Sequence, residues 1–335
     1  MSKTTIGFDI DTVEAKVVCL EHDGGAVRLA SYGIFSYGGD NNKLRDFIRG
    51  ANIPRGEVRV NIEDPSLKIR RLDLPNMPKE EMDEAIKWGM KDVIEGDVAD
   101  YTFRHVEIAP EDLDLQGKMP VLVFALKNSV IAARYDLLRS VRIRLPKVIE
   151  PNTGALQAIF DGVAGVERAN PQVLIDFGRH YSPFIVMGKK GPVFSRPLKG
   201  CGEDSLFEQI ARDLGIDNRT AEEKGRNIMR SSDIEKEPDI RLKNTVVQFY
   251  SKVAIELQRS IDGYALVFGR RKIERIYICG KGAYYPGFAD YLLKTIGLDV
   301  KMFDPFENID VRNFSPGPFD ALRSRFAIAC GLAVD

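Results

Sequence analysis

The pattern of apolar and polar positions repeats once along the chain. Residues 7–11 form a largely apolar run that contains Asp9, and a polar turn and a second apolar run follow. Residues 174–178 repeat this pattern around Asp176, again with polar residues and an apolar run behind it. Each copy predicts a β-hairpin whose first strand is buried and carries a carboxylate close to its end. The repeat leaves two interpretations open, namely two similar domains or two unrelated hairpins.

A third pattern lies near the end of the chain. Residues 276–279 predict a buried strand that leads into Gly280, Lys281 and Gly282. A strand, a glycine turn and a helix start can bring backbone N–H groups to a nucleotide, because glycine permits close backbone approach. Most joints of this kind are only tight turns, so the pattern alone does not identify a nucleotide site.

Helical spacing marks two further elements. Residues 242–268 carry apolar residues three and four positions apart, which predicts a long core-facing helix. A second helix begins near Pro78, where acidic residues follow in the first turn. Met82 and Ile86 fall on one face of this helix, and Trp88 lies off that stripe. Trp88 is therefore either a wider part of the packed face or partly exposed.

The composition excludes several classes of function. At 335 residues the chain suits two domains or more. Lys+Arg at 48 nearly balance Asp+Glu at 49, so no basic field favours nucleic acid. The four cysteines lie far apart and form no C-x-x-C pair, and the three histidines form no H-E-x-x-H motif, which argues against a disulfide framework or a zinc site. We recognise no signal peptide and no apolar run near the ~20 residues of a membrane span, so we expect a cytoplasmic protein.

The two aspartate hairpins and the glycine turn, in this order, resemble the phosphate and adenosine motifs of the actin, sugar kinase and Hsp70 superfamily. The resemblance narrows at residues 72–88, which read Leu-Asp-Leu-Pro-Asn-Met-Pro-Lys-Glu-Glu-Met-Asp-Glu-Ala-Ile-Lys-Trp. This segment is similar to the signature of the type IV pilus assembly protein PilM family, which is related to the cell-division protein FtsA. Residues 200–204, 305–306 and 326–333 also resemble that family, so the likeness covers essentially the whole chain.

The resemblance implies an α/β, actin-like (ASKHA) bilobed fold. Two related subdomains would surround a nucleotide cleft, and two small subdomains would be inserted into them. The expected subdomains are 1A (1–76, 147–171 and 320–335), 1C (77–146), 2A (172–205 and 272–319) and 2B (206–271).

The family also implies a partner. Its members hold the N-terminal cytoplasmic peptide of the bitopic membrane protein PilN in a groove beside the inserted subdomain. For this chain we expect a PilN-like partner, other pilus assembly proteins, and a position at the inner membrane that depends on the partner rather than on direct insertion. Trp88 is the candidate groove residue, although a methionine and aromatic helix face more often packs a core.

The resemblance further implies ATP and Mg²⁺ as cofactors, with residues carried over one at a time. Asp9 and Asp176 are the candidates for holding Mg²⁺ through water and for orienting an attacking water. The expected nucleotide-binding residues are Asp9, Asp11, Thr12, Val13 and Lys16 at the first hairpin, Asp176, Gly178 and Ser182 at the second, and Glu222, Gly280, Lys281 and Gly282 around the adenosine.

Several residues depart from the family pattern. Asp11 stands where glycine is usual, and its carboxylate would repel phosphate unless Mg²⁺ or Lys16 compensates. Lys281 replaces the middle glycine of the adenosine motif, and Gly225 stands where a lysine is expected. We therefore expect at most a slow ATPase. The alternatives are a nucleotide-free pseudo-ATPase scaffold of a related pilus or type II secretion machine, and a sugar kinase, for which no sugar-binding motif is present.

Overall fold

The structure is a computed structural model. It describes residues 3–51, 53–108, 117–162, 170–189, 191–229, 231, 233–269, 272–314, 317 and 319–334. The chain divides into two compact units. The first unit comprises Met1–Glu167, Lys189–Val193 and Asp304–Asp335, and the second comprises Arg168–Gly188 and Phe194–Phe303.

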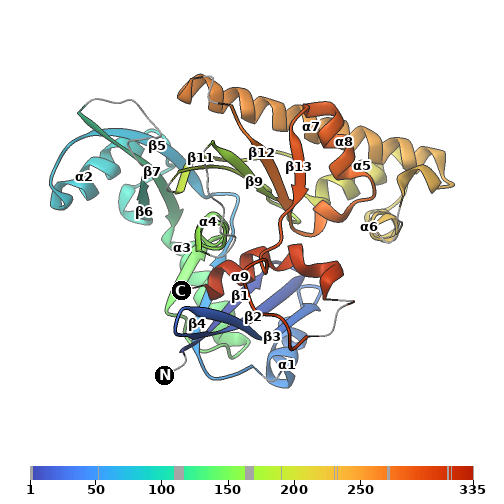
Figure 1. Cartoon of the computed structure of the whole chain (residues 1–335), viewed down its shortest axis with the longest axis horizontal. Helices are drawn as coiled ribbons and strands as arrows, with labels where there is room; N and C mark the ends of the chain where they lie inside the picture. The colour runs from blue at the N-terminus through green and yellow to red at the C-terminus, as the bar shows by residue number, and fades with distance from the viewer. Residues whose placement is uncertain are drawn as a thin grey trace. The chain divides into compact units, whose positions relative to one another are not determined.

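The first unit is built on a five-stranded sheet with the strand order β3-β2-β1-β4-β8 (Figure 1). The strands are β1 (Lys3–Ile10), β2 (Glu14–Asp23), β3 (Ala26–Ser36), β4 (Glu57–Ile62) and β8 (Val148–Pro151). The helices of this unit, apart from α2 in the insert, are α1 (Asn41–Gly50), α3 (Asn128–Ser140), α4 (Asn152–Gly162) and α9 (Ala327–Ala333), with the 3₁₀ segment η5 (Asp320–Phe326). β1 and β2 pair in antiparallel fashion, whereas β4 and β8 continue the sheet in parallel.

Alternation along β1 directs its side chains to two different layers. Ile6 and Phe8 share a core with Leu44 of α1 and Leu138 of α3. On the opposite face α9 lies so close to β1 that a Cβ at Gly7 would stand 2.0 Å from the carbonyl oxygen of Ala329. Glycine at this position therefore permits a close contact between helix and strand.

The first unit carries a second, three-stranded sheet with the order β5-β7-β6. Its strands are β5 (Lys68–Pro75), β6 (Tyr101–Glu107) and β7 (Lys118–Lys127), with α2 (Lys79–Met90) and the 3₁₀ turn η1 (Val98–Asp100). Met82, Ile86 and Met90 of α2 pack against one face of this sheet, which confirms the predicted stripe. Trp88 is 83% exposed on the outer side of the helix, so it is not a core residue.

The second five-stranded sheet, most of which belongs to the second unit, has the order β11-β10-β9-β12-β13. Its strands are β9 (Gln172–Asp176), β10 (Pro183–Gly188), β11 (Gly191–Pro197), β12 (Arg275–Cys279) and β13 (Asp299–Met302). The helices are α5 (Glu203–Leu214), α6 (Asn218–Ile228), α7 (Ile240–Phe268) and α8 (Phe288–Ile296), with the 3₁₀ turns η3 (Ile234–Lys236) and η4 (Lys281–Tyr284). The predicted long helix is α7, and the carboxylate of Asp239 caps its first turn.

The two five-stranded sheets share one topology. In each, an antiparallel hairpin contributes a first strand that pairs on its other side with a parallel strand from later in the chain. This arrangement confirms that the sequence repeat reflects two similar structural units, and it confirms the predicted α/β class. The division into four subdomains stays a prediction. Residues 304–319, expected with the second lobe, belong to the first unit, where the backbone of Asp310 bridges to Arg28 of β3.

The contact between α9 and α4 gives a stability prediction. A Cβ at Gly331 would lie 1.9 Å from the carbonyl oxygen of Ala155, so Gly331→Ala forces two backbones apart. We expect a loss of about 1–3 kcal/mol or more in the free energy of unfolding, measured by urea denaturation. Gly50→Ala is the control, because a Cβ at the end of α1 meets open space and should leave stability unchanged or slightly raised. Equal effects of the two substitutions would contradict the close packing of α9.

Candidate functional site

The first aspartate hairpin is organised around the buried carboxylate of Asp9. Asp9 is the partner of Lys16 in the β1–β2 register, and the Lys16 Nζ lies 2.6 Å from its Oδ2. The Nδ2 of Asn61 on β4 donates to the other oxygen of Asp9 at 2.9 Å and also to Asn152 at the start of α4. The backbone N–H of Ile10 in turn donates to the Asn61 side chain. Sequence analysis did not identify Asn61, because a single asparagine in a strand carries no distinctive pattern.

Burial and neighbouring charges shift the pKa values of Asp9 and Lys16 in opposite directions. Burial raises the pKa of Asp9, and the nearby Lys16 ammonium partly offsets that increase. Burial lowers the pKa of Lys16, but the carboxylates of Asp9, Glu14 and Asp11 outweigh burial and raise it overall. The Lys16 side chain is therefore a protonated ion-pair partner within the sheet.

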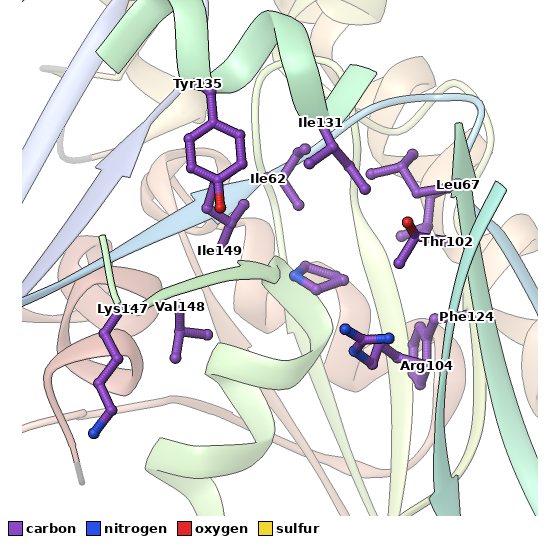
Figure 2. Close-up of a pocket in the computed structure, with 12 residues that line it drawn as sticks. Ile62, Leu67, Thr102, Arg104, Phe124, Ile131, Tyr135, Lys147, Val148 and Ile149 are labelled. Carbon is purple, nitrogen blue, oxygen red and sulfur yellow. The ribbon is translucent and has the colours of Figure 1, made fainter. Parts of the chain in front are cut away.

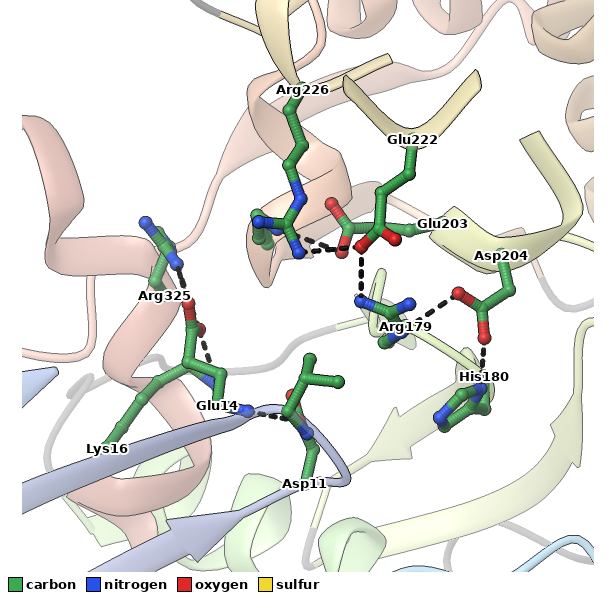
Figure 3. Close-up of polar contacts among 12 residues, drawn as sticks. Asp11, Glu14, Lys16, Arg179, His180, Glu203, Asp204, Glu222, Arg226 and Arg325 are labelled. Atoms are coloured by element: carbon green, nitrogen blue, oxygen red, sulfur yellow. Dashed lines mark hydrogen bonds and ion pairs between the residues drawn. The ribbon is translucent and has the colours of Figure 1, made fainter. Parts of the chain in front are cut away.

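The turn of the first hairpin is closed by the side chain of Asp11 (Figure 3). Its Oδ1 accepts hydrogen bonds from the backbone N–H groups of Val13 at 2.6 Å and Glu14 at 2.7 Å. This is an Asx-type turn, in which a carboxylate satisfies the amides a few residues ahead. The predicted site residues 11–13 thus lie together in one tight turn, and Glu14 after them pairs with Arg325.

The second hairpin brings Asp176 next to the glycine turn after β12. Cys279 pairs with Asp176 in the parallel register, and a Cβ at Gly280 would stand 2.3 Å from the Asp176 Oδ1. Gly280 has φ +80°, a left-handed conformation that favours glycine. The N–H of Gly282 donates to the carbonyl of Phe177 at 3.0 Å. The second hairpin and the glycine turn, both predicted to bind nucleotide, lie in contact within this unit, and their role toward a nucleotide stays a prediction.

Two other predicted residues lie in the loop between β9 and α5. The carbonyl of Gly178 accepts from the N–H of Glu203 at the start of α5, at 3.2 Å. Ser182 is fully buried, and its hydroxyl has no hydrogen-bond partner in the part of the chain that the structure describes. A buried hydroxyl of this kind retains the capacity to donate to an acceptor.

Charged side chains around this loop are linked to one another (Figure 3). Arg179 contacts Asp204 at 2.9 Å and Glu222 at 3.0 Å, and Glu222 also contacts Arg226 at 2.6 Å. Burial raises the pKa of Glu222, but the two guanidinium groups outweigh it and hold the pKa below its usual range. Lys281 lies 3.1 Å from the buried carboxylate of Glu203. The predicted ligands Glu222 and Lys281 are therefore both engaged within their own unit.

The glycine at position 225 has a packing explanation. A Cβ there would stand 2.4 Å from the Phe207 ring of α5, because α5 and α6 cross closely at this point. A lysine at this position would collide with Phe207. Gly225, which departs from the family pattern, therefore lets α6 pack closely on α5.

These contacts test whether a triphosphate fits the first hairpin. A phosphate-binding turn needs free backbone N–H groups and a nearby cation. Here the N–H groups of Val13 and Glu14 donate to Asp11, and the ammonium of Lys16 pairs with Asp9. The residues as arranged do not fit a phosphate at this turn, and the roles of Asp9 and Asp176 toward Mg²⁺ stay predictions.

A separate groove runs between the two sheets of the first unit (Figure 2). Its main part has a volume of about 470 Å³ and is lined mostly by apolar side chains from β4, β6, β7, α3 and β8. The lining includes Ile62, Thr102, Arg104, Phe124, Leu126, Ile131, Tyr135, Lys147, Val148 and Ile149. A neighbouring pocket of about 250 Å³ extends the groove toward Gln157 and shares five lining residues with the main part, namely Arg104, Phe124, Val148, Ile149 and Pro151.

The groove lies on the face of the small sheet opposite to the face that α2 covers. Val121 and Val123 of β7 point to α2, whereas Phe124 and Leu126 line the groove. Alternation along β7 could have indicated this second face, but the sequence did not show what lay opposite it. Trp88 does not line the groove, and its predicted role as a partner contact stays a prediction.

Comparison with solved structures establishes the fold. The chain is similar to a structure described as "PilM-PilN type IV pilus biogenesis complex", with a TM-score of 0.83 and 19% identity over 98% of this chain and 97% of that chain. It is also similar to the ethanolamine utilization protein EutJ from Carboxydothermus hydrogenoformans, with a TM-score of 0.54 and 11% identity over 100% and 89% of the two chains. MreB 5 of Spiroplasma citri bound to AMPPNP gives a TM-score of 0.50 and 10% identity over 98% and 94%. The predicted actin-like fold is confirmed.

The family follows from the sequence itself. The model of the family "Type IV pilus assembly protein PilM" matches residues 61–335, and the chain belongs to this family. A search of curated proteins finds no significant match. Across the described residues, the helices are all too short or too polar to span a bilayer.

The buried Asp9–Lys16 pair predicts a pH-dependent stability defect. Lys16→Met leaves the Asp9 carboxylate buried without its cation, which costs about 3–5 kcal/mol at neutral pH. Without Lys16, burial raises the Asp9 pKa further, so a neutral Asp9 is favoured in the folded state. The defect should therefore be small below about pH 4 and grow as the pH rises. Urea denaturation across pH checks this, and Lys16→Met combined with Asp9→Asn should recover part of the loss. A defect that is constant with pH would contradict the proposed pairing.

Proposed function

We propose that this chain is an actin-like adaptor of the type IV pilus inner-membrane assembly complex. It binds the N-terminal cytoplasmic segment of a PilN-like bitopic membrane protein in the groove of Figure 2. The groove carries the proposal, since it is an apolar channel within one unit and lies beside strands that end their sheets. The family and the fold shared with a PilM-PilN complex support the choice of partner.

Strand edges at the groove suit an extended segment. β8 is the last strand of the five-stranded sheet and β6 is the last strand of the small sheet, so each has one edge that no other described strand pairs with. An extended peptide can add to such an edge through its backbone, while every second side chain enters a pocket. Alternating apolar residues in the partner would meet the walls formed by Phe124, Ile131 and Ile149.

Charge in the groove adds a second requirement for the partner. Arg104 lines both parts of the groove and is exposed, and its guanidinium makes no ion pair with a described carboxylate. It donates to the backbone carbonyl of Phe103 at 2.8 Å. A carboxylate or an amide oxygen in the segment would give Arg104 a further acceptor. The preferred segment is therefore apolar at alternate positions with one such acceptor.

Recruitment to the membrane follows from the partner in this proposal. A bitopic partner whose cytoplasmic end lies in the groove holds the chain at the inner face of the inner membrane. This function uses neither ATP nor Mg²⁺, which the resemblance implies, because Asp11, Lys16, Lys281 and Glu222 are engaged within their units. The chain thus acts as a nucleotide-free scaffold, in a pilus system rather than a type II secretion system.

Two substitutions test the groove against the α2 surface. Ile131→Glu places a charge among apolar side chains, so the affinity for a labelled N-terminal PilN-like peptide should fall by about tenfold or more. Trp88→Ala removes an exposed ring outside the groove and should leave the affinity unchanged. Fluorescence polarisation measures both, with unfolding midpoints to verify that the variants fold. Weaker binding by Trp88→Ala together with normal binding by Ile131→Glu would place the peptide on α2 instead.

A further inference from the structure

The carboxylate of Asp11 accepts hydrogen bonds from the backbone of its own turn in the first hairpin. A turn that binds phosphate does so with backbone N–H groups that converge on an oxygen. At residues 11–14 two N–H groups converge on one oxygen, the Oδ1 of Asp11, at 2.6 and 2.7 Å. A carboxylate oxygen and a phosphate oxygen are both charged acceptors, so they compete for the same donors.

The surroundings hold this turn in its closed form. The N–H of Asp11 donates to the carbonyl of Glu14 at 2.9 Å, and the N–H groups of Tyr37 and Gly38 donate to the carbonyl of Val13 at 2.7 and 3.0 Å. The Tyr37 hydroxyl donates to the carbonyl of Asp11. Burial raises the pKa of Tyr37 to about 12, so this hydroxyl stays a donor at neutral pH. The turn is therefore fixed at both of its strands and at the segment after β3.

The cations beside this hairpin are engaged within the chain: Lys16 and Arg325 pair with carboxylates, and Arg134 donates to the backbone carbonyl of Ile10 at 3.1 Å. Glu14 is buried and pairs with Arg325, and its carboxylate also lies 3.8 Å from the Lys16 ammonium. Asp9 takes the same ammonium at 2.6 Å. A triphosphate entering this hairpin would face three carboxylates and would have to displace Asp11 from two amides.

We infer that Asp11 is a built-in occupant of the first phosphate turn, and that it keeps this chain from holding Mg-ATP there. The Asp11 carboxylate does so because it already accepts the hydrogen bonds that a phosphate oxygen would need. This effect adds to the repulsion between its charge and a phosphate. The inference rests on the nucleotide-free part of the proposed function and deepens it. Its failure is distinguishable from failure of the groove, because partner binding in the groove and nucleotide binding at the hairpin can be measured separately.

Removing the acceptor should create a nucleotide site. Asp11→Gly and Asp11→Ala free both N–H groups, and titration calorimetry of the full chain with Mg-ATP should then show saturable binding. We expect an affinity at least about tenfold above that of the wild-type chain, which corresponds to about 1.4 kcal/mol. Asp11→Asn is the matched variant, because its amide oxygen can still accept from Val13 and Glu14 although the charge is lost. It should bind no better than the wild type.

The controls keep the experiment decisive. Asp97→Gly removes another Asx-type contact of the first unit, from Asp97 to the N–H of Ala99, and should not change nucleotide affinity. Circular dichroism and unfolding midpoints verify that each variant folds. Strong Mg-ATP binding by the wild type would overturn the inference, as would binding by Asp11→Asn equal to that of Asp11→Gly, which would point to charge alone. Absence of binding in both the Gly and the Ala variants would also overturn it.

Discussion

The burial of one carboxylate links several elements of the first unit. Asp9 lies at the end of a central strand, and a charge in that position is stable only if cations and donors surround it. Lys16 supplies the cation from β2, and Asn61 supplies a donor from β4 while it also contacts Asn152 at the start of α4. The β1–β2 hairpin, strand β4 and helix α4 are thus all linked to the carboxylate of Asp9.

The same demand for compensation explains why the candidate phosphate site is filled from within. Asp11 satisfies the amides of its own turn, Glu14 pairs with Arg325, and Lys281 pairs with Glu203 in the second unit. Each of these contacts stabilises the folded chain at the expense of a group that could otherwise meet a nucleotide. The fold is actin-like, and these contacts support the proposal of a nucleotide-free scaffold.

Much of the architecture could be predicted from the sequence. The repeated strand pattern around Asp9 and Asp176 predicted two hairpins, and the spacing of Met82 and Ile86 predicted the packed face of α2, because both depend on residues close in sequence. The glycine turn was also found where expected, with Gly280 against Asp176.

The polar contacts and the groove could not be predicted in the same way. Arg179 and Glu222 lie 43 residues apart, and no local pattern relates them. The groove depends on the face that Phe124 presents to β8, which follows only from the packing of two sheets. The sequence shows that Asp11 departs from the family pattern, but only the structure shows that its carboxylate accepts hydrogen bonds from the amides of its own turn.

The most direct test of a nucleotide-independent adaptor is the affinity of the wild-type chain for the PilN-like segment, measured with and without saturating Mg-ATP. The groove lies within the first unit and the phosphate turn is filled by Asp11, so we predict the same dissociation constant in both conditions. Allosteric coupling in proteins is typically about 5–150-fold. A change of that size on addition of Mg-ATP would contradict the account and would make nucleotide a regulator of partner binding.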